Sequence, residues 1–292
     1  MFFEKYRKKK DGTIRFYDLH SKKIKVLCIL ILLLCLLMVV ISLFPAIWVF
    51  LAGFKELKEF RKSETILPSH FDIGVFAKTW TDLGFLKYYI NSFITVGGCV
   101  ACAVIFNGLL AYGLAILRPK GHKVVLGLVM WSLLIPATTS VVALFVNINR
   151  VGLNQSFLPL WLAFGANAFY VIMFKQFFEG LPSELLEAAR LDGCGVLRVF
   201  QQIILPLSKP IIAVIMIFAI TASWSDFLLP YLVLDGSGKE TVMVRLFAFR
   251  TSNATDVEVL RAVAFSMIPP TILFIIFQKK ITEGAAIGAL KG

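Results

Sequence analysis

Few side chains of this 292-residue chain are placed to take part in chemistry, and the most regular set lies in one polar segment between apolar runs. Two alanines beside a glutamate leave a backbone that another protein can approach, with a charge that fixes the register. A glycine shortly afterwards permits the positive φ of a sharp turn. These types at this spacing predict a contact that receives mechanical work from another protein. The residues are Glu187, Ala188, Ala189, Asp192, Gly193, Leu205 and Pro206.

Other residue types that carry chemistry do not form a set. Cys99 and Cys102 spell CxxC inside an apolar run, but no histidine or further cysteine is near enough in sequence to complete a metal site. The sequence has no glycine-rich phosphate-binding loop ending in Gly-Lys-Ser or Gly-Lys-Thr, so any ATP must be hydrolysed on another chain. We therefore expect no catalytic residue, no metal and no cofactor in this chain.

A second group of candidates lies within the apolar runs, where polar side chains are costly and often functional. Asp226 is the one acid well inside a run, Trp224 and Tyr231 are near it in sequence, and Asn91 lies in another run. Aromatic rings can stack on the apolar face of a ligand while polar groups bind its hydroxyls. Alternatively, Asp226 and Asn91 fix helix packing and the aromatic residues form an interfacial belt.

The composition places all these residues in a membrane protein. Hydrophobic residues make up 58% of the chain and charged residues only 16%, whereas soluble domains average about 25% charged residues. Nine of the 30 Lys and Arg residues precede Val26. A basic tail beside an apolar run is typical of the positive-inside rule, so we expect contact with membrane lipid and no nucleic acid. The uncharged run Val26–Phe54 is too long for a cleavable signal, whose apolar region has about 7–15 residues.

Six apolar segments are long enough to cross a bilayer, which takes about 20 helical residues. Each must be helical because backbone groups in lipid need internal partners. Pro269 and Pro270 predict a kink in the last span, and small residues such as Gly98 predict close packing of the second. The predicted spans are Val26–Leu51, a helix within Tyr88–Leu117, Val124–Val146, Ser156–Phe174, Pro210–Leu234 interrupted by Asp226, and Ala262–Gln278.

The distribution of Lys and Arg predicts the orientation. With the N-terminus inside, the inner segments hold 19 of these residues and the outer segments hold 11, as the positive-inside rule favours. We expect an all-α, multi-pass protein of the cell membrane with both termini in the cytoplasm. Its predicted parts are a basic cytoplasmic tail (residues 1–25), a six-helix transmembrane domain (26–280) and a cytoplasmic tail (281–292). The polar segment then lies in a cytoplasmic loop, residues 179–209.

Two short helices are expected in this loop. Ser183 can cap the first helix and Glu184 suits the positive end of its dipole, and the helix should run to about Leu191. A glycine-rich break follows, and a second helical stretch ends at Leu205-Pro206. The prediction is a helix–turn–helix elbow outside the membrane, and the alternative is an amphipathic loop on lipid headgroups.

The spacing in this elbow also carries a resemblance. Glu-Ala-Ala, three residues, Gly, nine residues, Ile, one residue and Leu-Pro, uninterrupted from Glu187 to Pro206, resembles the signature of ABC importer permease subunits. Similarity runs from about Val26 to Gly292, and the tail is similar to that of the second permease subunit in maltose-type systems. That family usually has Trp-Asn-Asp in the fifth span, and Ser225 replaces the Asn here, so no role of that amide is carried over. Motifs that resemble the carbohydrate branch are Gln176-Phe177-Phe178, Leu181-Pro182-Ser183-Glu184, Leu207-Ser208-Lys209-Pro210, Ser223-Trp224-Ser225-Asp226-Phe227 and Gly284–Gly292.

The resemblance implies a type I ABC importer permease fold in which the elbow is a coupling helix that docks on an ATPase subunit. The implied partners are a second permease subunit, two ATPase subunits that hold ATP and Mg²⁺, and an extracellular or periplasmic solute-binding protein. The implied cargo is a sugar or oligosaccharide, carried by alternating access. The outer segment Asp235–Glu258 is then a connector or a docking surface, and the tail after Lys280 is disordered or contacts the ATPase subunits.

Two other functions stay open at this point. The first is an ABC importer permease for a small solute that is not a sugar. The second is a self-sufficient secondary transporter, which predicts clusters of ionisable residues inside the spans. The sequence has one such acid and no cluster, so it favours the importer.

Overall fold

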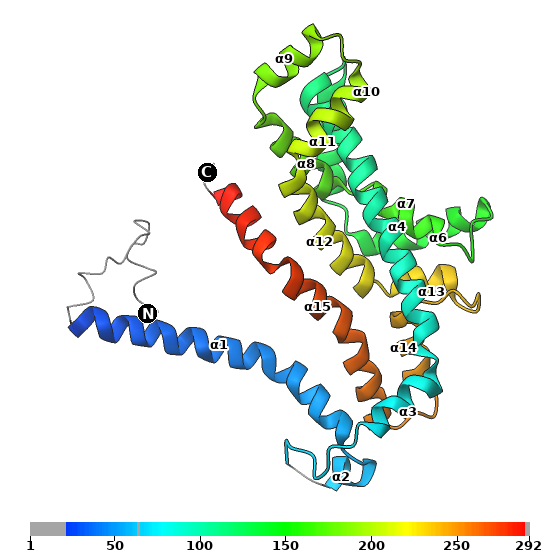
Figure 1. Ribbon diagram of the computed structural model, residues 1–292. Helices are drawn as coiled ribbons and strands as arrows, with labels where there is room; N and C mark the ends of the chain where they lie inside the picture. The colour runs from blue at the N-terminus through cyan, green and yellow to red at the C-terminus, as the bar shows by residue number, and fades with distance from the viewer. Residues whose placement is uncertain (1–21, 63–64, 290–292) are drawn as a thin grey trace.

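The computed structural model describes residues 22–62 and 65–289, and within these ranges the chain forms helices and no strand (Figure 1). The first half contains α1 (Lys22–Phe54), α2 (Leu57–Lys62), α3 (Gly74–Leu83), α4 (Phe85–Tyr112), the π-helix η3 (Gly113–Leu117), α5 (His122–Ser132) and α6 (Ala137–Arg150). The second half contains α7 (Leu158–Gly165), α8 (Ala168–Glu179), α9 (Ser183–Leu191), α10 (Val196–Val199), the π-helix η4 (Phe200–Ile204), α11 (Leu205–Leu207), α12 (Lys209–Ser225), α13 (Leu228–Leu234), α14 (Val242–Arg250) and α15 (Asp256–Ala289). The predicted tail 1–25 lies outside the described residues except for residues 22–25, which begin α1.

Five of the six predicted spans correspond to helices, or bent helix pairs, that are long and apolar enough to cross a membrane. Three are single helices: α1, α4 continued by η3, and α15. Counted as one span each, two bent pairs bring the number to five: α7 with α8, bent by 44°, and Val196–Leu207 with α12, bent by 81°. The helical backbone of α15 continues to Ala289, so most of the predicted tail 281–292 is helical rather than disordered.

The prediction of one continuous span over 124–146 is wrong. α5 ends at Ser132 and α6 begins at Ala137, with turns between them. Pro136 has no N–H to donate and disfavours helical geometry in the residue before it, and its own ψ of 128° directs the chain away from the helix. Hydropathy continues across this break, which is why the apolar pattern did not reveal it.

The fifth predicted span is also shorter than expected. α12 ends at Ser225, Asp226 is extended with φ −67° and ψ 128°, and α13 starts at Leu228. The interruption expected at Asp226 is therefore a complete break between two helices. The last span behaves differently, because α15 passes through Pro269 and Pro270 as one helix. The prolines that predict a kink therefore do not divide the helix in two.

The bend between α7 and α8 is held by a buried amide on α4. Asn107 is fully buried, and its Nδ2 donates to the carbonyls of Ala103 (2.8 Å) and Phe164 (2.9 Å). Its Oδ1 accepts from the backbone N–H of Asn167 at 2.9 Å. Asn167 in turn caps α8 by accepting from the Tyr170 N–H. One side chain therefore satisfies backbone groups that the break leaves without helical partners.

Small residues allow α4 and α7 to pack closely, as predicted for the second span. A Cβ added to Gly98 would lie 2.2 Å from the ring of Trp161, and one added to Gly165 would lie 2.9 Å from Phe106. A residue larger than glycine at either position would therefore clash with the aromatic ring that packs against it. The prediction of close approach is confirmed at Gly98, and the glycines bring the backbones together as in other membrane helix pairs.

α1 projects away from the other helices over most of its length (Figure 1). It is tied to them near its C-terminal end, where Arg261 of α15 donates to the carbonyls of Gly53 (2.6 Å) and Lys55 (3.3 Å). A cation at this point offsets the partial negative charge of the helix end. The side chains of residues 29–45 are exposed and, apart from Ser42, apolar, which suits contact with lipid or with another apolar protein surface.

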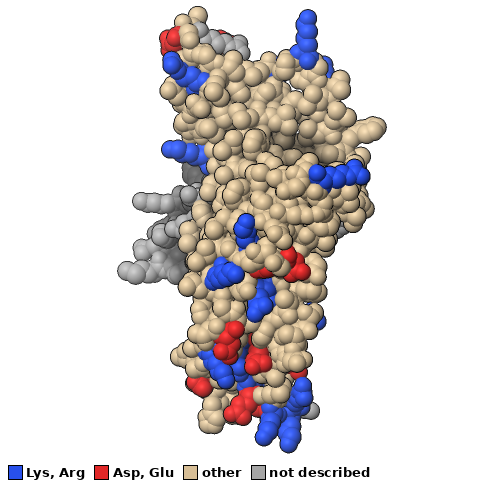
Figure 2. All heavy atoms as spheres, turned by 90° about the vertical axis from the view of Figure 1, so that its right-hand side faces the viewer, with Lys and Arg blue, Asp and Glu red and all other residues tan. Residues whose placement is uncertain are grey.

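The two ends of the molecule differ in character. α9, α10 and α11 lie at one end, α2 and α3 lie at the other, and α4 runs between them (Figure 1). Figure 2 shows acidic and basic side chains mixed at the lower end of one face, while most of the surface above carries few charges. This distribution matches a chain whose middle lies in lipid and whose ends lie in water.

Candidate functional site

The predicted elbow is present at the end of the molecule formed by α9, α10 and α11 (Figure 1). α9 covers Ser183–Leu191, in agreement with the predicted bounds. After it, Gly193 has φ +71°, a region that glycine enters without strain. The backbone N–H of Cys194 donates to the carbonyl of Ala189 at 3.0 Å. This bond belongs to a Schellman motif, which closes a helix end and fixes the direction in which the chain leaves it.

The two faces of α9 have different surroundings. Ala189 is 4% exposed and belongs to the buried cluster formed with α4, α8 and η4. The side chain of Ala189 therefore faces its own chain, and its small size lets α9 lie against α4 and α8, which the sequence did not indicate. Glu187, Ala188 and Asp192 are exposed. The surface that remains for a partner thus combines a small residue with two carboxylates.

The elbow also has an apolar tip that the sequence prediction did not include. Leu191 is 89% exposed at the end of α9, and Leu197 is exposed at the start of the second arm. Exposed leucines in a polar loop suit a surface that another protein covers. The sequence did carry a signal for this apolar tip, since a leucine flanks the glycine break on each side, where a solvent-facing turn normally has polar residues.

The second arm of the elbow joins it to α12. Ile204 of η4 is fully buried, and the Tyr112 hydroxyl of α4 donates to the carbonyl of Val196 at 3.1 Å. Leu205 is half-buried and Pro206 is exposed in α11, and the arm ends one residue after them. The hydroxyl of the buried Ser208 donates to the Ile204 carbonyl at 2.6 Å, at the 81° bend into α12. The second arm therefore connects α9 directly to the start of α12.

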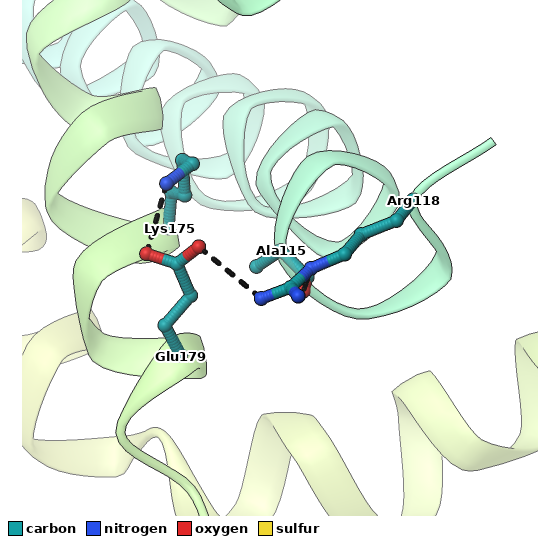
Figure 3. Close-up of polar contacts among 4 residues, drawn as sticks. All are labelled: Ala115, Arg118, Lys175 and Glu179. Carbon is teal, nitrogen blue, oxygen red and sulfur yellow. Dashed lines mark hydrogen bonds and ion pairs between the residues drawn. The ribbon is translucent and has the colours of Figure 1, made fainter. Parts of the chain in front are cut away.

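An open pocket of about 250 Å³ lies between α9 and the ends of η3 and α8. Beside it, Glu179 is held between two cations (Figure 3). Lys175 Nζ lies 2.8 Å from Glu179 Oε2, and Arg118 Nη2 lies 3.5 Å from Oε1. Arg118 Nε also donates to the Ala115 carbonyl at 2.8 Å. The pocket is lined by Ala115, Ile116, Arg118, Phe178, Glu179, Leu181, Ser183, Leu186 and Glu187.

This arrangement places the C-terminal ends of α8 and η3 beside α9. Glu179 is the last residue of α8, where a carboxylate is disfavoured by the helix dipole, and the two cations offset that cost. Arg118 ends η3 and is a favourable residue there for the same reason. Partly exposed ion pairs stabilise a fold by only about 0–1 kcal/mol. The contribution of this group is therefore local, in joining the end of α8 to the end of η3 beside the pocket.

Two of the four pathway candidates make structural contacts. Asn91 Nδ2 donates to the carbonyl of Glu240 at 3.0 Å and approaches that of Gly238 at 3.4 Å, which ties α4 to the loop before α14. Trp224 is 3% exposed, and its Nε1 donates to the Ser266 carbonyl at 3.1 Å. Its side chain is thus buried and bonded to α15, and it also lines a small pocket between α12 and α15. These contacts support the alternative in which such residues fix helix packing.

Of the other two candidates, Asp226 lies at the break between α12 and α13, and Tyr231 lies within α13. Asp226 accepts backbone N–H bonds at the start of α13, as a helix-capping residue does. Tyr231 is half-buried and stacks on Phe227 with ring centroids 5.3 Å apart. Phe247 of α14 packs on both rings and remains 41% exposed. Phe247 was not among the candidates, because it comes from a distant segment of the sequence.

Among the described residues no group of three or more His, Cys, Asp or Glu side chains is arranged to hold a metal ion. Cys99 is buried and contacts the Leu160 carbonyl, which is the packing role expected of a thiol in an apolar run. Within the described residues, the site therefore consists of the exposed face of α9 and a second arm that joins it to α12.

Comparison with known proteins places this architecture in a family. Residues 73–284 match the family described as "Binding-protein-dependent transport system inner membrane component". The chain is 29% identical to the diacetylchitobiose uptake system permease protein NgcG of Streptomyces coelicolor, over 88% of this chain and 87% of that protein. It is 31% identical to the melibiose/raffinose/stachyose import permease protein MelC of Bacillus subtilis, over 79% of this chain and 85% of that protein.

A solved structure shows the same fold. The chain superposes with a TM-score of 0.78 on a chain of a bacterial ABC transporter involved in the import of the acidic polysaccharide alginate. The match covers 89% of this chain and 98% of that chain at 23% sequence identity. Together with the family match and the elbow, this shows that the chain belongs to the binding-protein-dependent inner membrane components, the permease subunits of ABC importers.

Proposed function

We propose that this chain forms half of a pathway that imports a sugar or oligosaccharide by alternating access. A second permease subunit supplies the other half, and two ATPase subunits bind ATP and Mg²⁺ and contact the elbow. The observation that carries the proposal is the closed turn at Gly193 together with the 81° bend into α12. When ATP binding brings the ATPase subunits together, the elbow moves with them and turns α12.

The proposed cargo rests on the relatives and on one cluster of side chains. The two named relatives carry permease names for diacetylchitobiose and for melibiose, raffinose and stachyose. In this chain, Tyr231, Phe227 and Phe247 form a partly exposed aromatic group next to Asp226. Aromatic faces stack on sugar rings and polar groups bind their hydroxyls, so this group is our candidate for contact with the cargo.

The proposed orientation puts the elbow in the cytoplasm and the mixed-charge end outside. The Lys and Arg distribution supports both termini on the cytoplasmic side. The segment Asp235–Glu258, which contains α14, then faces outward, and a solute-binding protein that delivers the cargo would contact it there. Interfaces of this transient kind are commonly polar and charged, as the lower end of the face in Figure 2 is.

Purification of the complex through a tag on this chain tests the proposal. We expect a second permease, an ATPase with a phosphate-binding loop and a solute-binding protein to co-purify. In calorimetry against panels of oligosaccharides and of amino acids, the binding protein should bind at least one oligosaccharide and no amino acid. Binding of amino acids alone would assign the chain to a permease for a non-sugar solute. Uptake by this chain alone, driven by an ion gradient, would make it a secondary transporter.

A further inference from the structure

The two adjacent prolines of α15 leave two backbone carbonyls without their helical donors. In an α-helix each carbonyl accepts from the N–H four residues later. Phe265 and Ser266 would accept from residues 269 and 270, which are Pro269 and Pro270 and have no N–H. Carbonyls without partners are strongly disfavoured in the membrane interior, so donors from elsewhere are required at this step of the helix.

Two other membrane helices supply these donors. The hydroxyl of Tyr89 on α4 donates to the Phe265 carbonyl at 2.5 Å. The indole Nε1 of Trp224 on α12 donates to the Ser266 carbonyl at 3.1 Å. The rings of Tyr89 and Trp224 also pack edge to face, with centroids 5.7 Å apart. The proline step is therefore bonded to two different helices at consecutive residues, and the donors touch one another.

This position lies on the mechanical route from the elbow. α12 begins at the 81° bend after Ser208 and ends one residue after Trp224. A movement of the elbow that turns α12 therefore displaces the Trp224 indole at its far end. A helix bends most easily where its hydrogen-bond ladder is interrupted, and the indole is bonded to α15 at that interruption.

We propose that Trp224 and Tyr89 are positioning residues that couple movement of α12 and α4 to bending of α15 at Pro269-Pro270. The proposal rests on the function proposed above, since it names how the elbow acts on the pathway. A donor within α15 would satisfy the carbonyls equally well but would move with α15. Donors on other helices satisfy the carbonyls and also make the bend depend on where α12 and α4 stand.

Substitution of the prolines separates the two effects of these bonds, which are to satisfy the carbonyls and to link α15 to the other helices. Trp224→Phe removes the indole N–H, and Pro270→Ala gives the Ser266 carbonyl an N–H donor within α15. The combined variant Trp224→Phe/Pro270→Ala therefore has a satisfied carbonyl but no bond between the helices. Trp161→Phe is the matched control, because Trp161 Nε1 is buried and has no hydrogen-bond partner. Tyr89→Phe with Pro269→Ala repeats the experiment at the Phe265 carbonyl.

Each variant is measured in the complete complex in proteoliposomes, for thermal stability and for cargo imported per ATP hydrolysed. We expect Trp224→Phe to lower both, with import per ATP falling about three- to tenfold, the range that one interhelical hydrogen bond in a membrane supplies. The combined variant should regain the melting temperature but remain below Pro270→Ala alone in import per ATP. Trp161→Phe should match the wild type in import per ATP.

Equal import per ATP in the combined variant and in Pro270→Ala would overturn the proposal, because the bond between helices would then be structural only. A second pair keeps the test valid if Trp224→Phe fails to assemble, since Tyr89→Phe leaves the indole in place. Failure of this inference is distinguishable from failure of the proposed function. In the first case the wild-type complex still imports its cargo with ATP, and in the second case it does not.

Discussion

Replacement of Gly193 by valine is expected to reduce ATP-driven import strongly while the complex still assembles. Gly193 has φ +71°, where a β-branched residue is strained by about 1–3 kcal/mol. No atom lies within 4 Å of a Cβ built at this position, so the effect comes from the backbone and not from a clash. The backbone relieves this strain by changing its turn, so the second arm no longer leaves α9 in the wild-type direction. If the full strain enters the coupling step, import falls roughly tenfold or more.

Gly195→Val is the matched control for this prediction. Gly195 lies two residues away with φ −67° and ψ 156°, a region that any residue adopts, and a Cβ there also meets no atom within 4 Å. We expect near wild-type import for Gly195→Val and a large loss for Gly193→Val, at equal amounts of assembled complex. Equal import in the two variants would show that the left-handed turn is not needed for coupling.

Replacement of Asn107 by leucine is expected to cause the largest loss of stability. Both side chains branch at Cγ, but leucine is larger and makes none of the three hydrogen bonds to Ala103, Phe164 and Asn167. The N–H of Asn167 and the carbonyl of Phe164 then lose these partners at the break between α7 and α8. We expect a loss of about 2 kcal/mol in the free energy of unfolding, since each buried unpaired group costs about 1–3 kcal/mol.

The measurement is thermal unfolding of the purified complex in detergent, with Asn149→Leu as the control. Asn149 is exposed; its Nδ2 donates to the Phe145 carbonyl in its own helix, and its Oδ1 accepts from Asn154 Nδ2. Both bonds lie at the surface, so its replacement should change the free energy by less than about 0.5 kcal/mol. A melting temperature for Asn107→Leu equal to that of the control would mean that the break is held by other contacts.

The elbow was predictable because its signals are local. Ser183 and Glu184 mark a helix start, and Gly193 permits the turn that closes it. Both arms and their bounds follow from residues within a few positions of each other, and the structure confirms them. The family resemblance rests on the same residues, which is why the family assignment was also within reach of the sequence.

The contacts between distant segments were not predictable in the same way. Ala189 was assigned to the partner surface, and only the packing of α9 on α4 and α8 shows that it faces its own chain. The prolines of α15 indicate two free carbonyls from sequence alone, but Tyr89 and Trp224 are donors only because α4 and α12 pass beside them. Pro136 was a local signal for the break in the third span, and continuous hydropathy concealed it.

One measurement tests the central claim most directly, namely that this chain carries cargo by coupling to ATP hydrolysis on other chains. It is uptake of the oligosaccharide identified for the binding protein, into proteoliposomes that contain the complete complex. We predict uptake only with ATP and Mg²⁺ on the elbow side and loaded binding protein on the opposite side, and a strong loss with Gly193→Val. Uptake that continues without ATP, or that is unchanged by Gly193→Val, would contradict the account.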